Sequence, residues 1–413
     1  MKNILYISYD GMTDQLGQSQ VIPYIRELTK LGYRFHLLSV EKKERLEKTG
    51  PQIKELLDNA GISWSTMTFT KNPPLLSKLY DQWRLNRKAM AICHHEKIDL
   101  VHCRSYVPAA AGKKISQVLG IPFLFDIRGF WVDERVDSGL WKLDHFFYRT
   151  LYKKYKKLER TYFSGAAHII SLTHKGKEEL IMNYDVPAGK ITVIPCCADM
   201  AHFDYHRISN EEQQALRDQL GIAPGKKVLS YLGSLGGWYM TDEMLAFFSI
   251  MHRQDPETVF LIITHDKKEG ILQKARTHSI PDEAIVVQPA GRNEVPLLLS
   301  LSNWNLFFIK DAYSKKASSP TKQGEVMAMG IPVICNDIGD TGIIVREANA
   351  GTVISGFNPE EYKVVSRRIL NQPPVSKESI RQSACEYYDL KEGVKRYKGV
   401  YDHLFNQIPD KQA

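Results

Sequence analysis

The sequence predicts an α/β protein made of two doubly wound, Rossmann-like domains, each built on a parallel sheet. At 413 residues the chain is longer than a domain with a single hydrophobic core usually is, so two domains of roughly 200 residues are expected. Short apolar segments alternate with longer amphipathic segments along nearly the whole chain, which indicates repeated strand–helix–strand units. The alternation begins twice, once at the N-terminus and again at residue 228.

The first series opens with a strand at residues 4–9, a loop at 10–20, a helix at about 21–31 and a strand at 34–40. That order implies parallel pairing of the two strands. Further helices are expected near 44–60, 76–95, 109–119, 141–160 and 175–182, with strands at 100–103, 122–127, 168–172 and 191–195. The first loop does not follow the pattern Gly-x-Gly-x-x-Gly, which disfavours a nicotinamide site.

The second series follows residues 198–224, whose polar composition indicates an interdomain linker. A strand at 228–232 leads through the glycine-containing loop 233–239 into a helix at 241–251. Later strands are expected at 259–264, 284–288, 304–309 and 353–354, and helices from about 360 onward. The predicted domains are residues 1–205 and 206–389, with 390–413 forming a C-terminal helix that packs back towards the first domain.

Composition indicates a soluble, cytoplasmic protein. Hydrophobic residues make up 43% and charged residues 25% of the chain, and no apolar run reaches the ~18 residues that span a bilayer. The first residues enter a strand pattern directly, without the features of a signal peptide. Six cysteines show no Cys-x-x-Cys spacing, and Cys196 and Cys197 are adjacent. This pattern predicts reduced thiols rather than a metal site or a disulfide.

The positive charge lies entirely in the first half of the chain. Residues 1–205 hold 30 Lys and Arg against 22 Asp and Glu, whereas the remaining residues hold 25 of each. The excess peaks in residues 141–160, where bases alternate with Phe, Tyr and Leu. A basic helix that carries aromatic residues is typical of contact with an anionic membrane surface, at the inner face if the protein is cytoplasmic. The alternative is a solvated helix whose aromatic residues pack on its own domain. No nucleic-acid-binding motif accompanies the charge.

Residues 318–333 predict a loop, a helix and a buried strand in succession. The helix contains Lys322 and Glu325 and ends at Gly330, and Pro320 marks the loop before it. The free N–H groups at a helix start favour a phosphate, and Lys322 adds a full positive charge. Glu325, one turn later, can accept hydrogen bonds from two sugar hydroxyls. An ordinary helix-to-strand unit with a surface lysine is the alternative interpretation.

Four motifs in order resemble the retaining glycosyltransferases of family 4, of the group 1 type, which have the GT-B architecture. Residues 10–20, which contain Asp-Gly and Gly-Gln-Ser-Gln, look like the family's first glycine loop. Residues 194–199, with Phe203 downstream, are similar to the family's segment before the linker. Residues 231–235 match its second glycine turn, and residues 320–333 match its Glu-Ala-Met-Ala-x-Gly-x-Pro-Val signature. The resemblance covers nearly the whole chain.

The resemblance implies two domains that face a central cleft, with the donor bound by the second domain and the acceptor by the first. The nucleotide base is expected near residues 289–292. The donor-binding residues implied are Gly17, Gln18, Gly233, Ser234, Lys310, Ser319, Thr321, Lys322 and Glu325. The catalytic residues implied are Lys322, Glu325 and Arg128. The acceptor-side residues implied are Asp14, Arg104, Asp126 and Trp131. Because no Asp-x-Asp stands in a loop of the expected cleft, neither a metal nor another cofactor is expected.

Three departures from the family pattern stand out. Ala317 occupies the position of the first of two glutamates that the family usually has, the second being Glu325. Ser234 and Tyr239 stand in the region where the family commonly has a basic pair. Arg128 replaces a frequent histidine and stays protonated, so it cannot act as a base. It is expected to bind phosphate or orient the sugar, or alternatively to form a surface ion pair with Asp133 or Glu134.

The function implied is transfer of a hexosyl group from a nucleotide sugar to a glycan or lipid-linked acceptor, with retention of configuration. In that mechanism a donor phosphate oxygen takes the acceptor proton, so no strong protein base is required. Cell-surface polysaccharide or glycolipid synthesis is the expected setting, because the basic first half suits a lipid-linked diphosphate sugar. Two alternatives remain: a sugar-nucleotide epimerase on the same fold, and a weakened or non-catalytic binding subunit, which Ala317 and Arg128 favour.

Overall fold

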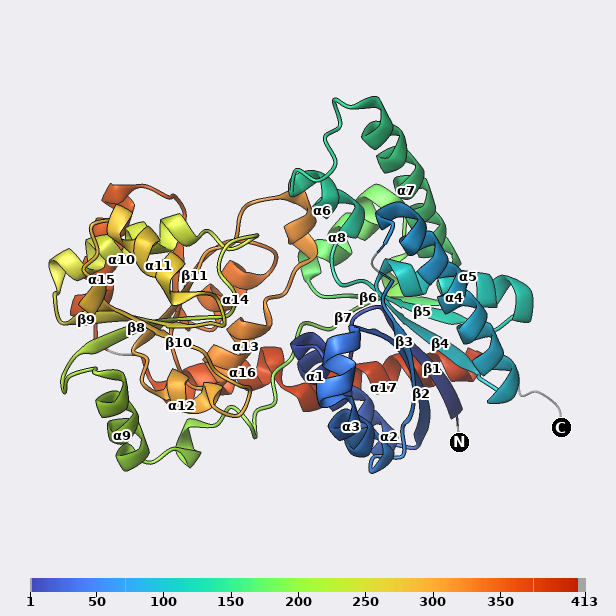
Figure 1. The fold of residues 1–413 in the computed structure, drawn as a ribbon, viewed down its shortest axis with the longest axis horizontal. Coiled ribbons are helices and arrows are strands. Elements are labelled where there is room, and N and C mark those ends of the chain that lie inside the picture. Colours follow the sequence, from blue (N-terminus) through green and yellow to red (C-terminus); the bar gives the residue numbers. More distant parts are fainter. Residues whose placement is uncertain (1, 71, 374, 408–413) are drawn as a thin grey trace. The chain divides into compact units, whose positions relative to one another are not determined.

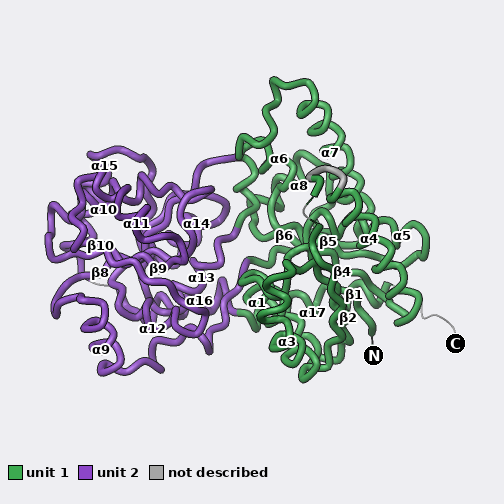
Figure 2. Tube along the Cα trace, viewed as in Figure 1, with its two compact units in different colours: residues 1–195, 313–318, 390–413 green, residues 196–312, 319–389 purple. Residues whose placement is uncertain are grey.

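The computed structural model describes residues 2–70, 72–373 and 375–407, and Figure 1 shows its helices and strands. The chain forms two compact units, as Figure 2 shows: residues 1–195, 313–318 and 390–413 make unit 1, and residues 196–312 and 319–389 make unit 2. Each unit has its own apolar core around its own sheet. Among the described residues no helix is both long and apolar enough to cross a bilayer.

Unit 1 is built on a parallel sheet of seven strands in the order β3-β2-β1-β4-β5-β6-β7. The strands are β1 (Lys2–Ser8), β2 (Tyr33–Glu41), β3 (Ser63–Thr68), β4 (Leu100–Arg104), β5 (Phe123–Asp126), β6 (His168–Ser171) and β7 (Ile191–Val193). The central strands β4, β5 and β6 are wholly buried. The edge strand β3 was not predicted, because most of its side chains are polar and only partly buried.

Helices connect these strands in the predicted alternation. They are α1 (Gln15–Gln20), α2 (Ile22–Lys30), α3 (Lys43–Asp58), α4 (Pro74–His95), α5 (Tyr106–Leu119), α6 (Trp131–Asp137), α7 (Phe146–Gly165) and α8 (His174–Tyr184), with the 3₁₀ helices η1 (Ala188–Lys190) and η4 (Tyr313–Ala317) and the C-terminal α17 (Leu390–Gln407). Helix α7 begins five residues later than the predicted 141–160 segment. Each connecting helix leaves the carboxyl end of one strand and returns to the amino end of the next parallel strand.

Unit 2 is built on a parallel sheet of six strands in the order β10-β9-β8-β11-β12-β13. The strands are β8 (Lys227–Leu232), β9 (Thr258–Ile263), β10 (Ile285–Gln288), β11 (Trp304–Phe307), β12 (Val333–Asn336) and β13 (Gly351–Ile354). The helices are α9 (Asn210–Leu220), α10 (Thr241–Gln254), α11 (Lys268–Thr277), α12 (Val295–Ser300), α13 (Thr321–Ala328), α14 (Thr341–Glu347), α15 (Pro359–Asn371) and α16 (Lys377–Tyr388), with the 3₁₀ helices η2 (Tyr205–Arg207) and η3 (Asp282–Ala284).

The chain passes from unit 1 to unit 2 after Pro195, ten residues before the predicted boundary. Backbone contacts explain the shift, because Ala198 N donates to the Tyr388 carbonyl and Cys196 N donates to Ser319 Oγ. The prediction that residues 198–224 form a linker is wrong. They lie within unit 2 and contain α9, whose start at Ser209 carries a complete capping box that the polar composition concealed.

A second exchange between the units was not predicted. Residues 313–318, which the sequence places in the second domain, belong to unit 1. Thr173 Oγ1 donates to the Lys316 carbonyl at 2.6 Å, and Ser314 N donates to the Asp137 carboxylate at 2.8 Å. These bonds attach η4 to α6 and α8. Residues 314–325 thus belong to two elements, η4 in unit 1 and the start of α13 in unit 2.

Candidate functional site

A buried lysine, a glycine turn and two tyrosine rings come together at the carboxyl edge of the unit 2 sheet. Strand β8 ends at Leu232, and Gly233 follows it with φ at +114°, a backbone conformation that favours glycine. Lys322, the second residue of α13, reaches back across this turn. Its Nζ lies 3.5 Å from the ring centre of Tyr239 and 4.1 Å from that of Tyr231. A Cβ built on Gly233 would lie 3.1 Å from the same Nζ, so a side chain there would crowd the lysine.

Lys322 is a buried ammonium that lacks an acceptor. The residue is only 7% exposed, and its Nζ has no hydrogen-bond partner among the described residues. Burial lowers the pKa of Lys322 well below its ordinary value, and the nearby Glu325 carboxylate opposes that shift. The two tyrosine faces stabilise the cation in part, but they leave its hydrogen-bonding capacity unused. The site is therefore suited to an anionic ligand that supplies oxygen atoms.

Glu325 lies one helical turn after Lys322 on α13. Its Oε1 is 3.5 Å from Arg292 Nη1, and its side chain is 12% exposed. Burial raises the pKa of Glu325, while Arg292 acts in the opposite direction. Arg292 is itself held by the segment that contains His202 and Phe203: its guanidinium lies 5.6 Å from the ring centre of Phe203, and its carbonyl lies 3.1 Å from His202 Nε2. The charges of Lys322, Glu325 and Arg292 thus alternate in sign: positive, negative and positive.

The other predicted donor residues of unit 2 lie in the loops that follow β8 and β11. Ser234 is exposed, Ser319 and Thr321 are half-buried, and Thr321 begins α13. Lys310 is exposed, and it stands three residues after β11 ends at Phe307 rather than at the end of the predicted strand. We therefore place Lys322 and Glu325 at the centre of the candidate site, and Lys310 at its solvent-exposed margin.

Ala317, the position of the expected first glutamate, is a core residue of unit 1. It is 2% exposed and belongs to the apolar cluster of that unit. An ideal Cβ on Gly176 of α8 would lie only 3.0 Å from the Ala317 Cβ, so the two segments are packed closely. A glutamate at position 317 would have to displace α8 or point elsewhere.

Gly17 and Gln18 do not lie in the loop that the sequence predicts over residues 10–20. Both lie inside α1, and Gly17 is buried. A Cβ on Gly17 would overlap the carbonyl oxygen of Gly11 and would lie 2.6 Å from Met12 Cα. Gln18 Nε2 donates to the Thr13 carbonyl at 3.4 Å. The glycine is thus required for close packing of α1 on the segment after β1, and not for a left-handed turn.

We expect Gly17→Ala to destabilise unit 1 by about 1–3 kcal/mol, because the added methyl overpacks the α1 contact. Chemical denaturation of wild type and variant measures this difference. Gly270→Ala is a matched control, since Gly270 lies within α11 and a Cβ there would meet nothing within 4 Å. That control should gain about 0.5–1 kcal/mol. Equal stability of Gly17→Ala and wild type would contradict the assignment.

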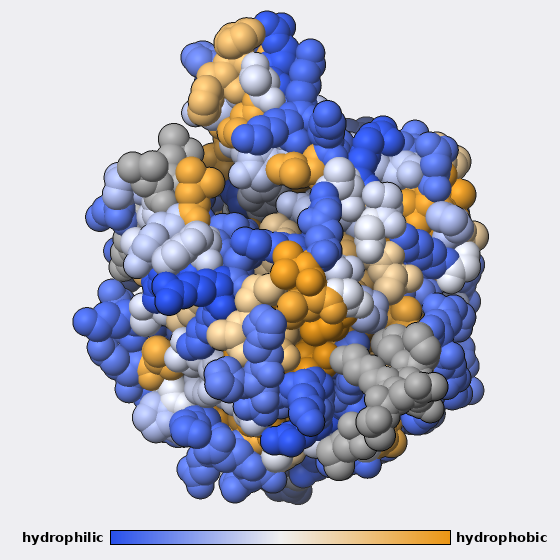
Figure 3. Space-filling view, turned by 90° about the vertical axis from the view of Figure 1, so that its right-hand side faces the viewer, coloured by the Kyte–Doolittle hydropathy of each residue, from blue (hydrophilic) through white to orange (hydrophobic). Residues whose placement is uncertain are grey.

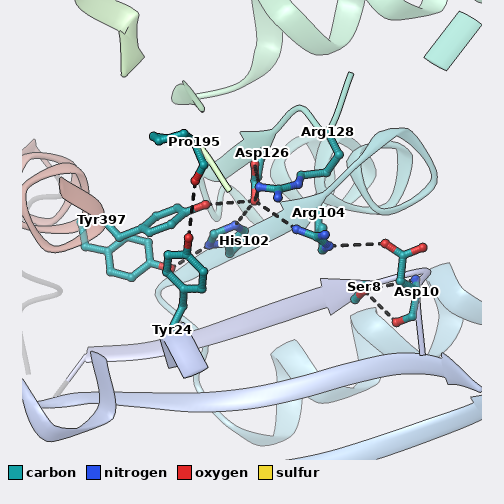
Figure 4. Close-up of polar contacts among 10 residues, drawn as sticks. Ser8, Asp10, Tyr24, His102, Arg104, Asp126, Arg128, Pro195 and Tyr397 are labelled. Carbon is teal, nitrogen blue, oxygen red and sulfur yellow. Dashed lines mark hydrogen bonds and ion pairs between the residues drawn. The ribbon is translucent and has the colours of Figure 1, made fainter. Parts of the chain in front are cut away.

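At the carboxyl edge of unit 1, four charged side chains come together (Figure 4). They are Asp10 after β1, Arg104 at the end of β4, Asp126 at the end of β5, and Arg128 two residues later. Arg104 Nε lies 3.4 Å from Asp10 Oδ2, and its Nη1 lies 3.9 Å from Asp126 Oδ2. Arg128 Nη1 lies 3.3 Å and 3.4 Å from the two oxygens of Asp126. Asp126 is fully buried, whereas the Asp10 side chain is 46% exposed.

Helix α17 completes this network from the far end of the chain. Tyr397 OH donates to Asp126 Oδ2 at 3.1 Å, and His102 Nε2 lies 3.5 Å from the same oxygen. Tyr401 OH lies 2.7 Å from His102 Nδ1. Burial lowers the pKa of His102, so the imidazole is neutral. Burial alone would raise the pKa of Asp126, but Arg128, His102 and Arg104 together hold it well below its usual range.

Arg128 bonds to Asp126 in this network, and Asp133 has different partners. Asp133 Oδ1 accepts from Tyr152 OH, and its Oδ2 lies 2.8 Å from Lys156 Nζ. The predicted alternative was a surface ion pair of Arg128 with Asp133 or Glu134. The pair with Asp133 does not form, and Glu134 Oε1 lies 3.5 Å from Lys315 Nζ. Two further acceptor-side residues stand apart from the network. Asp14 pairs with Lys42 and Arg45. The ring of Trp131 packs against those of Tyr106, Trp141 and Tyr155.

Sequence reasoning missed the residues that act through non-local contacts. Tyr231 and Tyr239 flank Lys322 from the β8 side, yet they precede it by about 90 residues. Tyr397 approaches Asp126 across 271 positions. No local pattern marks either pairing. Arg292 carried a partial signal, because residues 289–292 were predicted to border the nucleotide base.

Two family models match the chain, one mostly over unit 1 and the other mostly over unit 2. The model described as Glycosyltransferase Family 4 matches residues 19–202, and the model described as Glycosyl transferases group 1 matches residues 212–386. Among curated relatives, the D-inositol 3-phosphate glycosyltransferase of Rhodococcus jostii is 19% identical over 223 residues, which is 52% of this chain and 47% of the relative. That of Corynebacterium diphtheriae is 20% identical over 291 residues, covering 69% and 65%. The first match thus spans about half of the relative's length.

Solved structures match over nearly the whole chain at low identity. A glycosyltransferase from Rickettsia africae superposes with a TM-score of 0.72 at 15% identity, with 98% of both chains covered. Sucrose-phosphate synthase from Thermosynechococcus elongatus gives 0.73 at 14%, covering 99% of this chain and 100% of the other. HepE from Anabaena, in complex with UDP and glucose, gives 0.70 at 14%, covering 97% and 100%. With these matches and its two Rossmann-like units, the chain has the GT-B fold and belongs to glycosyltransferase family 4, group 1 type.

Proposed function

We propose that this chain transfers a hexosyl group from a nucleoside-diphosphate sugar to a glycan or lipid-linked acceptor, with retention of configuration. The observation that carries the proposal is Lys322 Nζ, a buried ammonium without a hydrogen-bond partner among the described residues, beside the Gly233 turn. Burying a charge without a partner destabilises the folded protein, and a bound ligand of opposite charge offsets that cost. A diphosphate supplies both the negative charge and the oxygen acceptors.

The relatives support a sugar nucleotide as the donor. HepE from Anabaena has been solved with UDP and with UDP-glucose. The curated relatives are named as transferases that act on D-inositol 3-phosphate. At identities of 14–22% these names support the class of reaction, and they leave the sugar and the acceptor to experiment.

Lys322 would act on the departing diphosphate. As the bond between the sugar and the phosphate breaks, negative charge grows on the leaving group, and a preorganised donor stabilises it. Gly233 lets the backbone approach this group, since it carries no side chain. Glu325, one turn away and balanced by Arg292, would accept hydrogen bonds from two ribose hydroxyls. The half-buried Ser319 and Thr321 at the start of α13 add donors around the phosphates.

Retention fits the state of the unit 1 polar network. Asp126 is held ionised by two guanidiniums and a tyrosine, and His102 is buried and neutral, with Tyr401 beside one ring nitrogen and Asp126 beside the other. Both side chains are buried and their polar atoms face partners within unit 1, so neither is available to an acceptor hydroxyl as a general base, and Arg128 stays protonated. A donor phosphate oxygen would take the acceptor proton on the face from which the leaving group departs. We propose cell-surface polysaccharide or glycolipid synthesis as the setting, on the positive charge of the first half of the chain.

A thermal-shift screen of nucleoside diphosphates tests the donor site. A ligand present at about 100 times its dissociation constant stabilises the folded protein by about 2.7 kcal/mol. We expect one nucleoside diphosphate to raise the melting temperature of wild type and of Lys363→Met, an exposed lysine of α15. The same nucleotide should fail to raise that of Lys322→Met. If no nucleoside diphosphate raises the melting temperature of wild type, the proposed donor site is wrong. Binding without sugar release from any sugar nucleotide would favour a binding subunit.

A further inference from the structure

Two groups of large apolar side chains stand exposed on unit 1, in the first half of α4 and around the start of α7. On α4, Leu79 is 67%, Tyr80 51% and Trp83 53% exposed. The second group comprises Leu140, Leu143, Phe146 and Phe147, at 56%, 37%, 73% and 50% exposure. These seven are half of the fourteen large apolar side chains that are exposed among the described residues. Such a concentration marks an interaction surface rather than scattered surface residues.

Both groups lie at the same edge of the unit 1 sheet. Helix α4 precedes β4 and α7 precedes β6, and both of these strands are parallel to their neighbours. A helix in such a connection begins at the carboxyl edge of the sheet and ends towards the amino edge. The starts of α4 and α7 therefore lie at the edge that holds Asp10, Arg104 and Arg128. In Figure 1 the connection from α6 to α7 rises at the top of unit 1, and the top of Figure 3 shows hydrophobic and hydrophilic residues intermixed there.

Helix α7 divides its aromatic residues between two faces. Tyr152 OH donates to Asp133 at 2.8 Å, Tyr155 packs on Trp131 and Trp141, and Tyr162 and Phe163 are buried. The inner face therefore packs on the unit, as one of the two sequence interpretations expected. Phe146 and Phe147 do not share this role, because they remain exposed at the first turn. The helix is held rigidly from within, while its start is free to contact another surface.

Positively charged side chains border the apolar groups, and of these Arg84 on α4 pairs with Asp81 at 3.6 Å. Arg149, Lys153, Lys154 and Lys157 are exposed on α7 and take part in no ion pair among the described residues. On α4, the rings of Tyr80 and Trp83 stack with centres 6.0 Å apart. Arg84 and Arg87 lie over these rings, 5.4 Å and 5.6 Å from the centres. Aromatic and aliphatic tips ringed by bases match the boundary between anionic headgroups and acyl chains.

We propose that the first half of α4 and the start of α7 form a docking surface for an anionic phospholipid bilayer. The apolar side chains enter the headgroup boundary, and the α7 bases contact phosphates. Because the surface borders the carboxyl edge of unit 1, it brings that edge to the membrane. The acceptor class that follows is a lipid-linked one, and this part of the inference rests on the proposed transferase function.

Co-sedimentation of the full chain with vesicles tests the surface. We expect strong binding to phosphatidylcholine vesicles that also contain phosphatidylglycerol, weak binding to phosphatidylcholine alone, and release by high salt. Each lysine near an anionic surface contributes about fivefold to binding, so Lys153→Gln/Lys154→Gln/Lys157→Gln should lose about 100-fold. Phe146→Glu/Phe147→Glu should lose more than roughly tenfold, because it removes the inserted side chains.

Val118→Glu/Met182→Glu is the matched control. These apolar residues are 60% and 66% exposed, and they lie near the ends of α5 and α8, at the amino edge of the same sheet. The control should bind vesicles as wild type does. Recovery of wild type in the supernatant under all conditions would overturn the proposal, as would equal losses in the control and the Phe146/Phe147 variant. The nucleotide thermal shift is measured without vesicles, so failure of either hypothesis is read separately.

Discussion

Replacing Lys322 with methionine is expected to lower the rate of sugar transfer by roughly 100- to 1000-fold, because one preorganised donor to a developing charge contributes about 3–4 kcal/mol. Methionine preserves most of the volume of the side chain and removes only its charge. The same substitution should leave the ligand-free protein more stable than wild type. An ammonium that is 7% exposed and has no acceptor among the described residues opposes folding, and methionine is a well-packed replacement.

The pH dependence of stability provides an independent signature of Lys322. Its folded-state pKa is lowered, so between that value and its ordinary pKa the unfolded chain binds more protons than the folded chain. The contribution of Lys322 to the free energy of unfolding therefore rises with pH across this window, and Lys322→Met should abolish that rise. Nucleotide affinity should fall over the same window, since binding to phosphate requires the protonated amine.

Steady-state kinetics with a sugar nucleotide, together with chemical denaturation, measure both effects. A loss of activity without any gain in stability would mean that the buried ammonium is already compensated, contrary to the assignment. Retained activity would exclude Lys322 from the chemistry. Lys363→Met, at an exposed position of α15, serves as the control and should change neither quantity.

Replacing Asp126 with asparagine is expected to destabilise unit 1 by about 3–5 kcal/mol, because it leaves two neighbouring guanidiniums without their buried counter-charge. Arg104 and Arg128 both lie within 4 Å of this carboxylate, and Tyr397 of α17 donates to it. We therefore expect faster amide exchange along α17 as well as a melting temperature lower by roughly 10 °C. Asp10→Asn is the matched control, since its 46% exposed side chain should cost less than about 1 kcal/mol.

Acid should act on the same network. Below a pH of about 6.5 the unfolded chain protonates a histidine that the fold keeps neutral, so His102 makes stability fall as the pH decreases. The lowered pKa of Asp126 adds stability that is present above the carboxyl's unfolded value and is lost as pH falls through the folded value. Urea denaturation across this range measures the loss. A wild-type stability that is flat below neutral pH would contradict the buried network.

Much of the fold was predictable because it depends on local periodicity. Alternating strand and helix segments indicate parallel sheets. Because the alternation begins twice along the chain, it indicates two such sheets. The motif around Lys322 and Glu325 was predictable for the same reason, since a loop, a helix start and two charges one turn apart are consecutive in the chain. The edge strand β3 and helix α9 were missed where polar composition outweighed the pattern.

Only the tertiary structure decided what surrounds those charges. Gly17, expected in a loop, makes a close helix contact, because Gly11 and Met12 pack against α1. Asp126 is a buried structural anion because α17 returns across 271 positions to bind it. Lys322 is a buried cation rather than a surface lysine because Tyr231 and Tyr239 cover it. The sequence by itself determined which residues carry charge and on which local elements they stand. Burial and partners depend on long-range packing, which no local pattern encodes.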